Sequence, residues 1–139
     1  MSGLSELEMR VLSELEEAGE ENVAAMLNTI TRPVGDATEL ADLQRALENL
    51  LRGNFVRMSM DRDSTGRLRD LSADESLDVI ADLTSGLRFN SEKMYWTDTR
   101  HNGPPYGDQF PYVVNTPAGK AKGFAILEKR GYQWWRPKT

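Results

Sequence analysis

The sequence TELADLQRALENLLRGNFVRM, residues 38–58, decides the fold of this 139-residue chain. Leucines recur along it at three- and four-residue steps, which predicts a helix with one apolar stripe. Thr38 is expected to cap that helix, which runs to Arg52, and Gly53 is expected to stop it. The inward stripe consists of Leu40, Leu43, Leu47, Leu50 and Leu51. Asn54–Met60 then alternates in character and predicts a strand.

Four further helices are predicted outward from this stretch. They cover Ser5–Ala18, Glu21–Thr29, Ala73–Thr84 with Ser72 as cap, and the segment from Thr116-Pro117 to Gly131. The first shows apolar residues at helical spacing and glutamates in its first turn, where the helix dipole favours anions. Thr31–Asp36 separates the second helix from the third, because it contains a proline and a glycine.

The second half of the chain predicts a β-hairpin. Leu87–Trp96 has the mixed character of a strand, and Phe110–Asn115 is a second β-prone run. The eleven residues of Thr99–Gln109 lie between them and are rich in turn-forming residues. We therefore expect Glu92–Trp96 and Phe110–Asn115 to pair in antiparallel fashion around this loop. The closing YQWW, residues 132–135, is expected to pack as a strand or an ordered tail.

Several of these segments resemble the core of winged helix-turn-helix transcriptional regulators. LSELEMRVLSELEEAG, ENVAAMLNTI and the opening stretch are similar to the three helices of that core. YVVNTPAGKAKGFAILEKRGY is similar to the strand, Thr-x-x-Gly turn and helix that often follow the wing. The match covers residues 4–60 and 110–130. Two departures are a long link between the second and third helices and the segment 61–90, which has no place in the minimal fold.

The resemblance implies an α+β fold in a single domain over residues 1–139. Residues 4–60 would form the helical core, 61–90 a helical insertion after the third helix, and 91–139 a wing hairpin, a helix and a C-terminal tail. A small antiparallel sheet would include the wing. In this family the hairpin is the wing, so the loop Thr99–Gln109 is expected to be its tip.

The resemblance also implies a DNA-binding transcriptional regulator. In such proteins the third helix enters the major groove of double-stranded DNA, and the wing contacts the backbone or the minor groove. The candidate DNA-binding residues are Thr38, Arg45, Asn49 and Arg52 on the third helix, Arg100 and His101 in the loop, and Lys120 and Lys122 near the start of the last helix. Against this, four acids and only two arginines lie between Asp36 and Arg52, and DNA phosphates repel such a surface.

An alternative of a different class is a non-catalytic protein–protein interaction or dimerisation module on the same scaffold. Its surface would come from the acidic first helix, the insertion and the aromatic C-terminal region. The insertion and the GYQWW segment, residues 131–135, also favour a homodimer, because contiguous apolar surface tends to become an interface.

Charge is spread unevenly along the chain. The formal net charge of −5 divides into −6 for residues 1–31, 0 for 32–60, −4 for 61–86 and +5 for 87–139. An acidic front and a basic back would steer an anionic partner to one face. The same pattern also arises when charges serve only to solubilise a surface.

Motifs for catalysis and metal binding are sparse. The chain has no cysteine and a single histidine, and it lacks nucleophile-elbow and phosphate-loop motifs. Asp61–Ser72 partly matches a calcium loop, but Ser72 stands where a bidentate glutamate is needed, so a surface turn is expected. We therefore expect a protein that is not an enzyme and binds no metal or cofactor. With no membrane span or signal peptide in the sequence, a cytoplasmic protein is expected.

Overall fold

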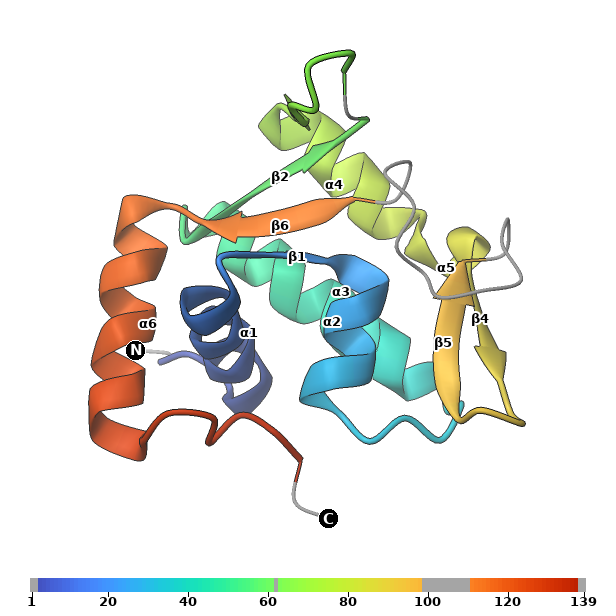
Figure 1. Cartoon of the computed structure of the whole chain (residues 1–139), viewed down its shortest axis with the longest axis horizontal. Helices are drawn as coiled ribbons and strands as arrows, with labels where there is room; N and C mark the ends of the chain where they lie inside the picture. The colour runs from blue at the N-terminus through green and yellow to red at the C-terminus, as the bar shows by residue number, and fades with distance from the viewer. Residues whose placement is uncertain (1–2, 62, 99–110, 138–139) are drawn as a thin grey trace.

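The computed structural model describes residues 3–61, 63–98 and 111–137 as a mixture of helices and small sheets (Figure 1). The helices in these ranges are α1 (Glu6–Ala18), α2 (Val23–Ile30), α3 (Ala37–Arg52), α4 (Ala73–Ala81), α5 (Leu83–Gly86) and α6 (Pro117–Arg130). The strands are β1 (Glu20–Asn22), β2 (Val56–Met60), β3 (Arg69–Asp70), β4 (Leu87–Asn90), β5 (Tyr95–Asp98) and β6 (Tyr112–Asn115). The strands pair in antiparallel fashion, so the predicted α+β class is confirmed.

Helix α3 begins on an aspartate that the sequence analysis passed over. The Asp36 carboxylate accepts a hydrogen bond from the backbone N–H of Thr38 at 3.0 Å, and Glu39 completes a capping box. The prediction that Thr38 caps the helix is therefore wrong. A carboxylate two residues earlier satisfies the free N–H groups, and the helix dipole favours its negative charge. The predicted stripe is confirmed: Leu40, Leu43, Leu47 and Leu50 are buried and Leu51 is half-buried.

The larger sheet has the strand order β1-β6-β2-β3. Strand β6 joins its two halves, because Val113 lies opposite Glu21 of β1 on one side and Met58 of β2 on the other. Val113 and Met58 are fully buried in the core that the sheet shares with the helices. The sequence analysis missed β1 and β3, which are only three and two residues long and lack apolar alternation.

The predicted hairpin between Glu92–Trp96 and Phe110–Asn115 is wrong. Strand β5 pairs with β4 in a separate two-stranded sheet, whereas β6 belongs to the larger sheet. The predicted single strand Leu87–Trp96 is in fact this β4–β5 hairpin. Its turn is set by Asn90, whose side-chain oxygen accepts hydrogen bonds from the two N–H groups at 92 and 93, and by Met94 at φ 58°. The loop Thr99–Gln109 lies outside the described residues.

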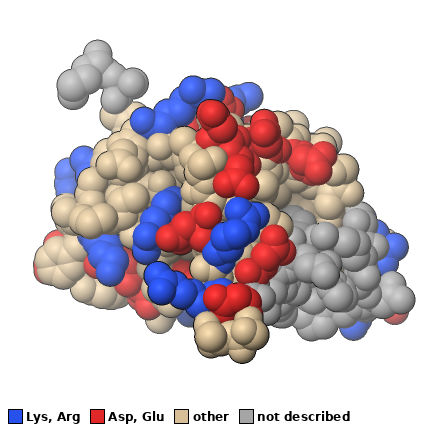
Figure 2. All heavy atoms as spheres, turned by 90° about the horizontal axis from the view of Figure 1, so that it is seen from above, with Lys and Arg blue, Asp and Glu red and all other residues tan. Residues whose placement is uncertain are grey.

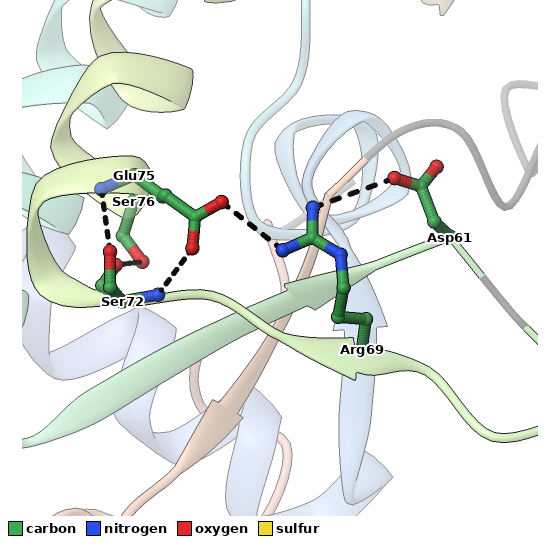
Figure 3. A network of polar contacts seen from close by, with 5 residues as sticks. All are labelled: Asp61, Arg69, Ser72, Glu75 and Ser76. Carbon is green, nitrogen blue, oxygen red and sulfur yellow. Dashed lines mark hydrogen bonds and ion pairs between the residues drawn. The ribbon is translucent and has the colours of Figure 1, made fainter.

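The insertion after β2 is anchored by a polar network around Arg69 (Figure 3). Arg69 pairs with Glu75 at 3.1 Å and with Asp61 at 3.7 Å, which ties β3 to the start of α4 and the end of β2. Ser72 caps α4 as predicted, and Glu75 closes the capping box. The helix ends at Ala81 and α5 follows it, so the predicted continuous helix to residue 84 is too long. The insertion also contacts α3. The side-chain amide of Gln44 in α3 donates a hydrogen bond to the Ile80 carbonyl of α4 at 2.7 Å.

Helix α6 lies at the outer edge of the molecule, with α1 between it and α3 (Figure 1). It starts at Thr116-Pro117 as predicted, and the structure shows Thr116 to be its cap. Gly119 and Gly123 face inward, because a Cβ on them would lie 1.9 Å from the Phe55 carbonyl oxygen and 2.7 Å from that of Leu12. These close approaches leave the alanine-rich opposite side of α6 exposed.

The C-terminal tail folds back over α1 as a series of turns. The indole N–H groups of Trp134 and Trp135 donate to Ser13 and Glu17, and Trp135 is buried. The C-terminal segment therefore packs as a tail and not as a strand, which is one of the two forms predicted from the sequence. The two tryptophans of the GYQWW segment are thus used within the chain, whereas Tyr132 is 61% exposed.

Candidate functional site

The exposed side of α3 carries four of the predicted site residues, and all four have partners within the chain, Thr38 through its hydrogen bond to Asp36. Arg52 binds Glu48 of the same helix, with nitrogen–oxygen distances of 2.9 and 3.1 Å. Arg45 lies 3.9 Å from Asp42, and its side chain is 73% exposed. Asn49 donates to Glu8 of α1 at 3.0 Å. The side chains of Arg45, Asn49 and Arg52 thus each lie beside a carboxylate of their own chain.

Three open recesses border this side of α3. The largest, of ≈ 620 Å³, lies between the starts of α1 and α3 and the C-terminal tail, and Thr38 is on its wall. A second, of ≈ 340 Å³, lies between α1 and α3, and a third, of ≈ 450 Å³, lies between α3 and α4. The first two share Leu7 and Asp42, and the last two share Arg45. The three recesses thus share wall residues along α3, and we call them together the α3 track.

The α3 track is electrically balanced. Its lining includes 5 acidic and 5 basic residues. They are Glu6, Glu8, Glu39, Asp42 and Glu48, against Arg10, Arg32, Arg45, Arg52 and Arg136. On the face drawn in Figure 2, acidic side chains gather toward the upper right, and charges of both signs alternate below them. The adjoining helix α4 adds only acids, namely Asp74, Glu75 and Asp78.

The widest part of the α3 track contains residues that the sequence analysis did not select. Arg10 donates to the carbonyls of Ile30 and Trp135, at 3.3 and 3.0 Å, and so fixes the tail against α1 and α2. Trp134 lines the recess, and the Arg130 guanidinium lies 3.8 Å from the centre of its ring. The only signal in the sequence was the clustering of aromatic and basic residues near the C-terminus, which does not say what they contact.

The remaining predicted site residues are not brought to this surface. Lys120 and Lys122 are exposed on α6, which α1 separates from α3. The structure therefore does not unite them with Arg45 and Arg52. Arg100 and His101 lie outside the described residues.

One titratable group is buried beneath these surfaces. Glu14 of α1 is 1% exposed, and its Oε1 has no hydrogen-bond partner among the described residues. Burial, together with the negative charges of Glu21 and Glu17, raises the pKa of Glu14 to about 8. Burial also raises the pKa of Glu21. A solute cannot reach the Glu14 carboxyl in this conformation, so we assign it a role in stability and not in binding.

The calcium-like loop is used for local structure. The Asp63 carboxylate accepts hydrogen bonds from both the backbone and the hydroxyl of Thr65 and from the backbone of Arg67, while Asp61 pairs with Arg69. These contacts lower the pKa of Asp63, the Thr65 side-chain hydrogen bond most of all. Within the described residues, no group of three histidine, cysteine or acidic side chains is arranged to hold a metal ion. No described helix has the length and apolar character that crossing a membrane requires.

Comparisons of the chain with family models, with curated proteins and with solved structures find no match.

Proposed function

We propose that this protein is a non-catalytic binding domain whose α3 track receives a segment of a protein partner. The observation that carries the proposal is the balance of charge along the track, with 5 acids and 5 bases in its lining. Binding to a nucleic acid depends on an excess of cations that replace counterions on the phosphates. A balanced lining supplies no such excess, whereas a peptide can present charges of both signs.

The shape of the track supports the same proposal. It combines apolar walls from Leu7, Ile30 and Trp134 with charged rims, and its recesses share wall residues. An apolar anchor surrounded by polar groups is the usual composition of a protein interface. Arg45 lies where two recesses meet and is the track residue best placed to contact a partner from both sides.

Selection from a displayed library of random twelve-residue peptides tests the proposal directly. We expect enriched peptides that carry an aromatic or aliphatic residue together with charges of both signs. Their affinity should fall about tenfold in Leu7→Glu or Arg45→Glu and stay unchanged in the matched control Arg57→Glu, on the exposed side of β2. Failure to enrich any peptide sensitive to Leu7 and Arg45 contradicts the proposal.

DNA binding is the second candidate, and one observation favours it. Arg45 is the most exposed arginine on α3, and its 3.9 Å contact with Asp42 is at the outer limit of an ion pair, so DNA would release it at little cost. Together with the resemblance to winged helix-turn-helix regulators, this keeps Arg45 and Arg100 as candidate contacts. Titration of mixed-sequence duplexes at low salt separates the two functions. We expect no binding at micromolar protein; tight binding that weakens steeply with salt would replace the first proposal by this one.

A further inference from the structure

Helix α6 has a second surface that the proposed function does not use. Its inner side packs against α1 and the Phe55 carbonyl. Its outer side exposes Ala118, Ala121 and Ala125 to solvent. Phe124 projects from this outer side with 48% of its surface exposed. An exposed phenylalanine beside a row of alanines combines one large apolar side chain with positions that another helix can approach closely.

The charges on either side of Phe124 follow the same ridge of the helix. Lys120, Phe124 and Glu128 are spaced by four residues, so they form one row on the helix surface. Each step of four residues rises about 6 Å, which puts the lysine and the glutamate at equal distances on opposite sides of the ring. Both charged side chains are exposed, and within the described residues neither forms an ion pair.

This row is complementary to itself when it is reversed. We propose that α6 pairs with α6 of a second copy of this chain in antiparallel orientation, centred on Phe124. In a twofold arrangement each Lys120 then lies against the partner's Glu128, at both ends of a contact between the two phenylalanines. Rows of residues four apart pack into each other's grooves in the commonest class of helix crossing, and the alanines permit that close approach. The α3 track stays outside this contact, because α1 lies between α3 and α6.

The proposed homodimer uses the outer side of α6, whereas the sequence pointed to the insertion and the GYQWW segment. Trp134 and Trp135 of the GYQWW segment contact Ser13 and Glu17 of their own chain, and α4 of the insertion contacts α3 of its own chain. The exposed ridge on α6 supplies an alternative that depends on neither.

Sedimentation equilibrium at low ionic strength tests the pairing with charge exchange. The wild-type chain should dimerise in the micromolar range, and K120E or E128K should each weaken the dimer about tenfold or more, because like charges then face each other at both ends. An equimolar mixture of K120E and E128K should recover dimerisation, since one protomer then offers two acidic side chains and the other two basic ones. The double variant K120E/E128K should recover it as well.

Two further variants keep the experiment decisive. Phe124→Ala should weaken the dimer without affecting helix content, which circular dichroism measures, because the ring is on the outer side of α6. Lys93→Glu, in the exposed β4–β5 turn, makes the same charge change far from the ridge and should leave the dimer intact. A wild-type chain that stays monomeric at several hundred micromolar overturns the proposal. So does a dimer that responds alike to K120E and K93E, or a mixture that fails to recover. None of these outcomes bears on peptide binding at the α3 track.

Discussion

The exposed sides of α3 and α6 carry similar side chains in different electrostatic surroundings. On α3, Arg45 and Arg52 each lie beside an acid of the same helix. On α6, Lys120 and Glu128 are eight residues apart, too far to pair along the helix, and no described residue pairs with them. The comparison teaches that a count of charges on a helix does not measure its capacity to attract a partner. What matters is whether those charges are already neutralised by neighbours.

The inner sides of the two helices differ as well, and the largest expected effect is on α3. Leu47→Ala removes a fully buried side chain and should lower the free energy of unfolding by about 2–5 kcal/mol. Denaturant titration measures this loss. Val34→Ala, at a position 66% exposed, is the control and should change stability by less than about 0.5 kcal/mol. A loss below about 1 kcal/mol for Leu47→Ala would mean that the α3 stripe does not hold the core together.

The inner side of α6 packs closely because it carries glycines, so a larger residue there should lower the stability of the protein. Gly119→Ala places a methyl group against the Phe55 carbonyl oxygen, where an ideal Cβ would lie 1.9 Å away. We expect a loss of about 1–3 kcal/mol by overpacking, although alanine has the higher helix propensity. Ala121→Gly, on the outer side of the same helix, is the reference for propensity alone. If Gly119→Ala stabilises the protein in thermal unfolding, α6 is not docked as closely as described.

Between the two helices, Glu14 of α1 makes stability depend on pH. The folded state keeps its proton up to a pKa of about 8, whereas the unfolded chain releases it near 4.5. The folded state therefore binds more protons in this window, and the contribution of Glu14 to stability falls as pH rises from 4.5 to 8, by roughly 1 kcal/mol per unit. Below this window its contribution is fully present, and above it the loss is complete.

Glu14→Gln should flatten that dependence, because the amide does not titrate. Urea titrations at pH 5, 6, 7 and 8 measure the slope for both proteins. A smaller slope in the same direction should remain from Glu21, whose pKa burial also raises. Equal slopes for the variant and the wild type would show that Glu14 is solvated in the folded protein.

The smallest expected effect is at the exposed side of α3. Arg45→Ala should change the free energy of unfolding by less than about 0.5 kcal/mol, because an exposed contact at 3.9 Å contributes little. The same substitution should reduce peptide binding at the α3 track. If it costs more than about 1 kcal/mol in stability, Arg45 is part of the packing and the contrast between α3 and α6 is weaker than we infer.

Local patterns in the sequence predicted the helices well. The burial of Leu43, Leu47 and Leu50, the cap at Ser72 and the start of α6 at Thr116-Pro117 all depend on residues within four positions of one another. The cap of α3 was misplaced for a local reason too, since Asp36 and Thr38 are both good caps and the stronger acceptor lies two residues earlier.

Strand partners and candidate-site contacts did not follow from local patterns. Strand β6 pairs with β1 and β2, and its distance along the chain from β1 is about 90 residues, so no spacing rule predicts the pair. The DNA-site prediction grouped Lys120 with Arg45 because both are cationic, and their separation by α1 is invisible in a linear sequence.

The sequence by itself determined which segments become helices and which side of each faces the core, because both properties repeat with the period of the helix. Local spacing placed an acid beside Arg45 and another beside Arg52, whereas tertiary structure decided which of the other polar side chains find a partner. Asn49 is held by Glu8 from 41 residues away and Arg130 by Glu6 from 124 residues away, whereas Lys120 and Glu128 on the outer side of α6 meet no such partner in the described structure. The physical reason is that an ion pair depends on distance in space, and packing sets that distance only after the local elements have formed.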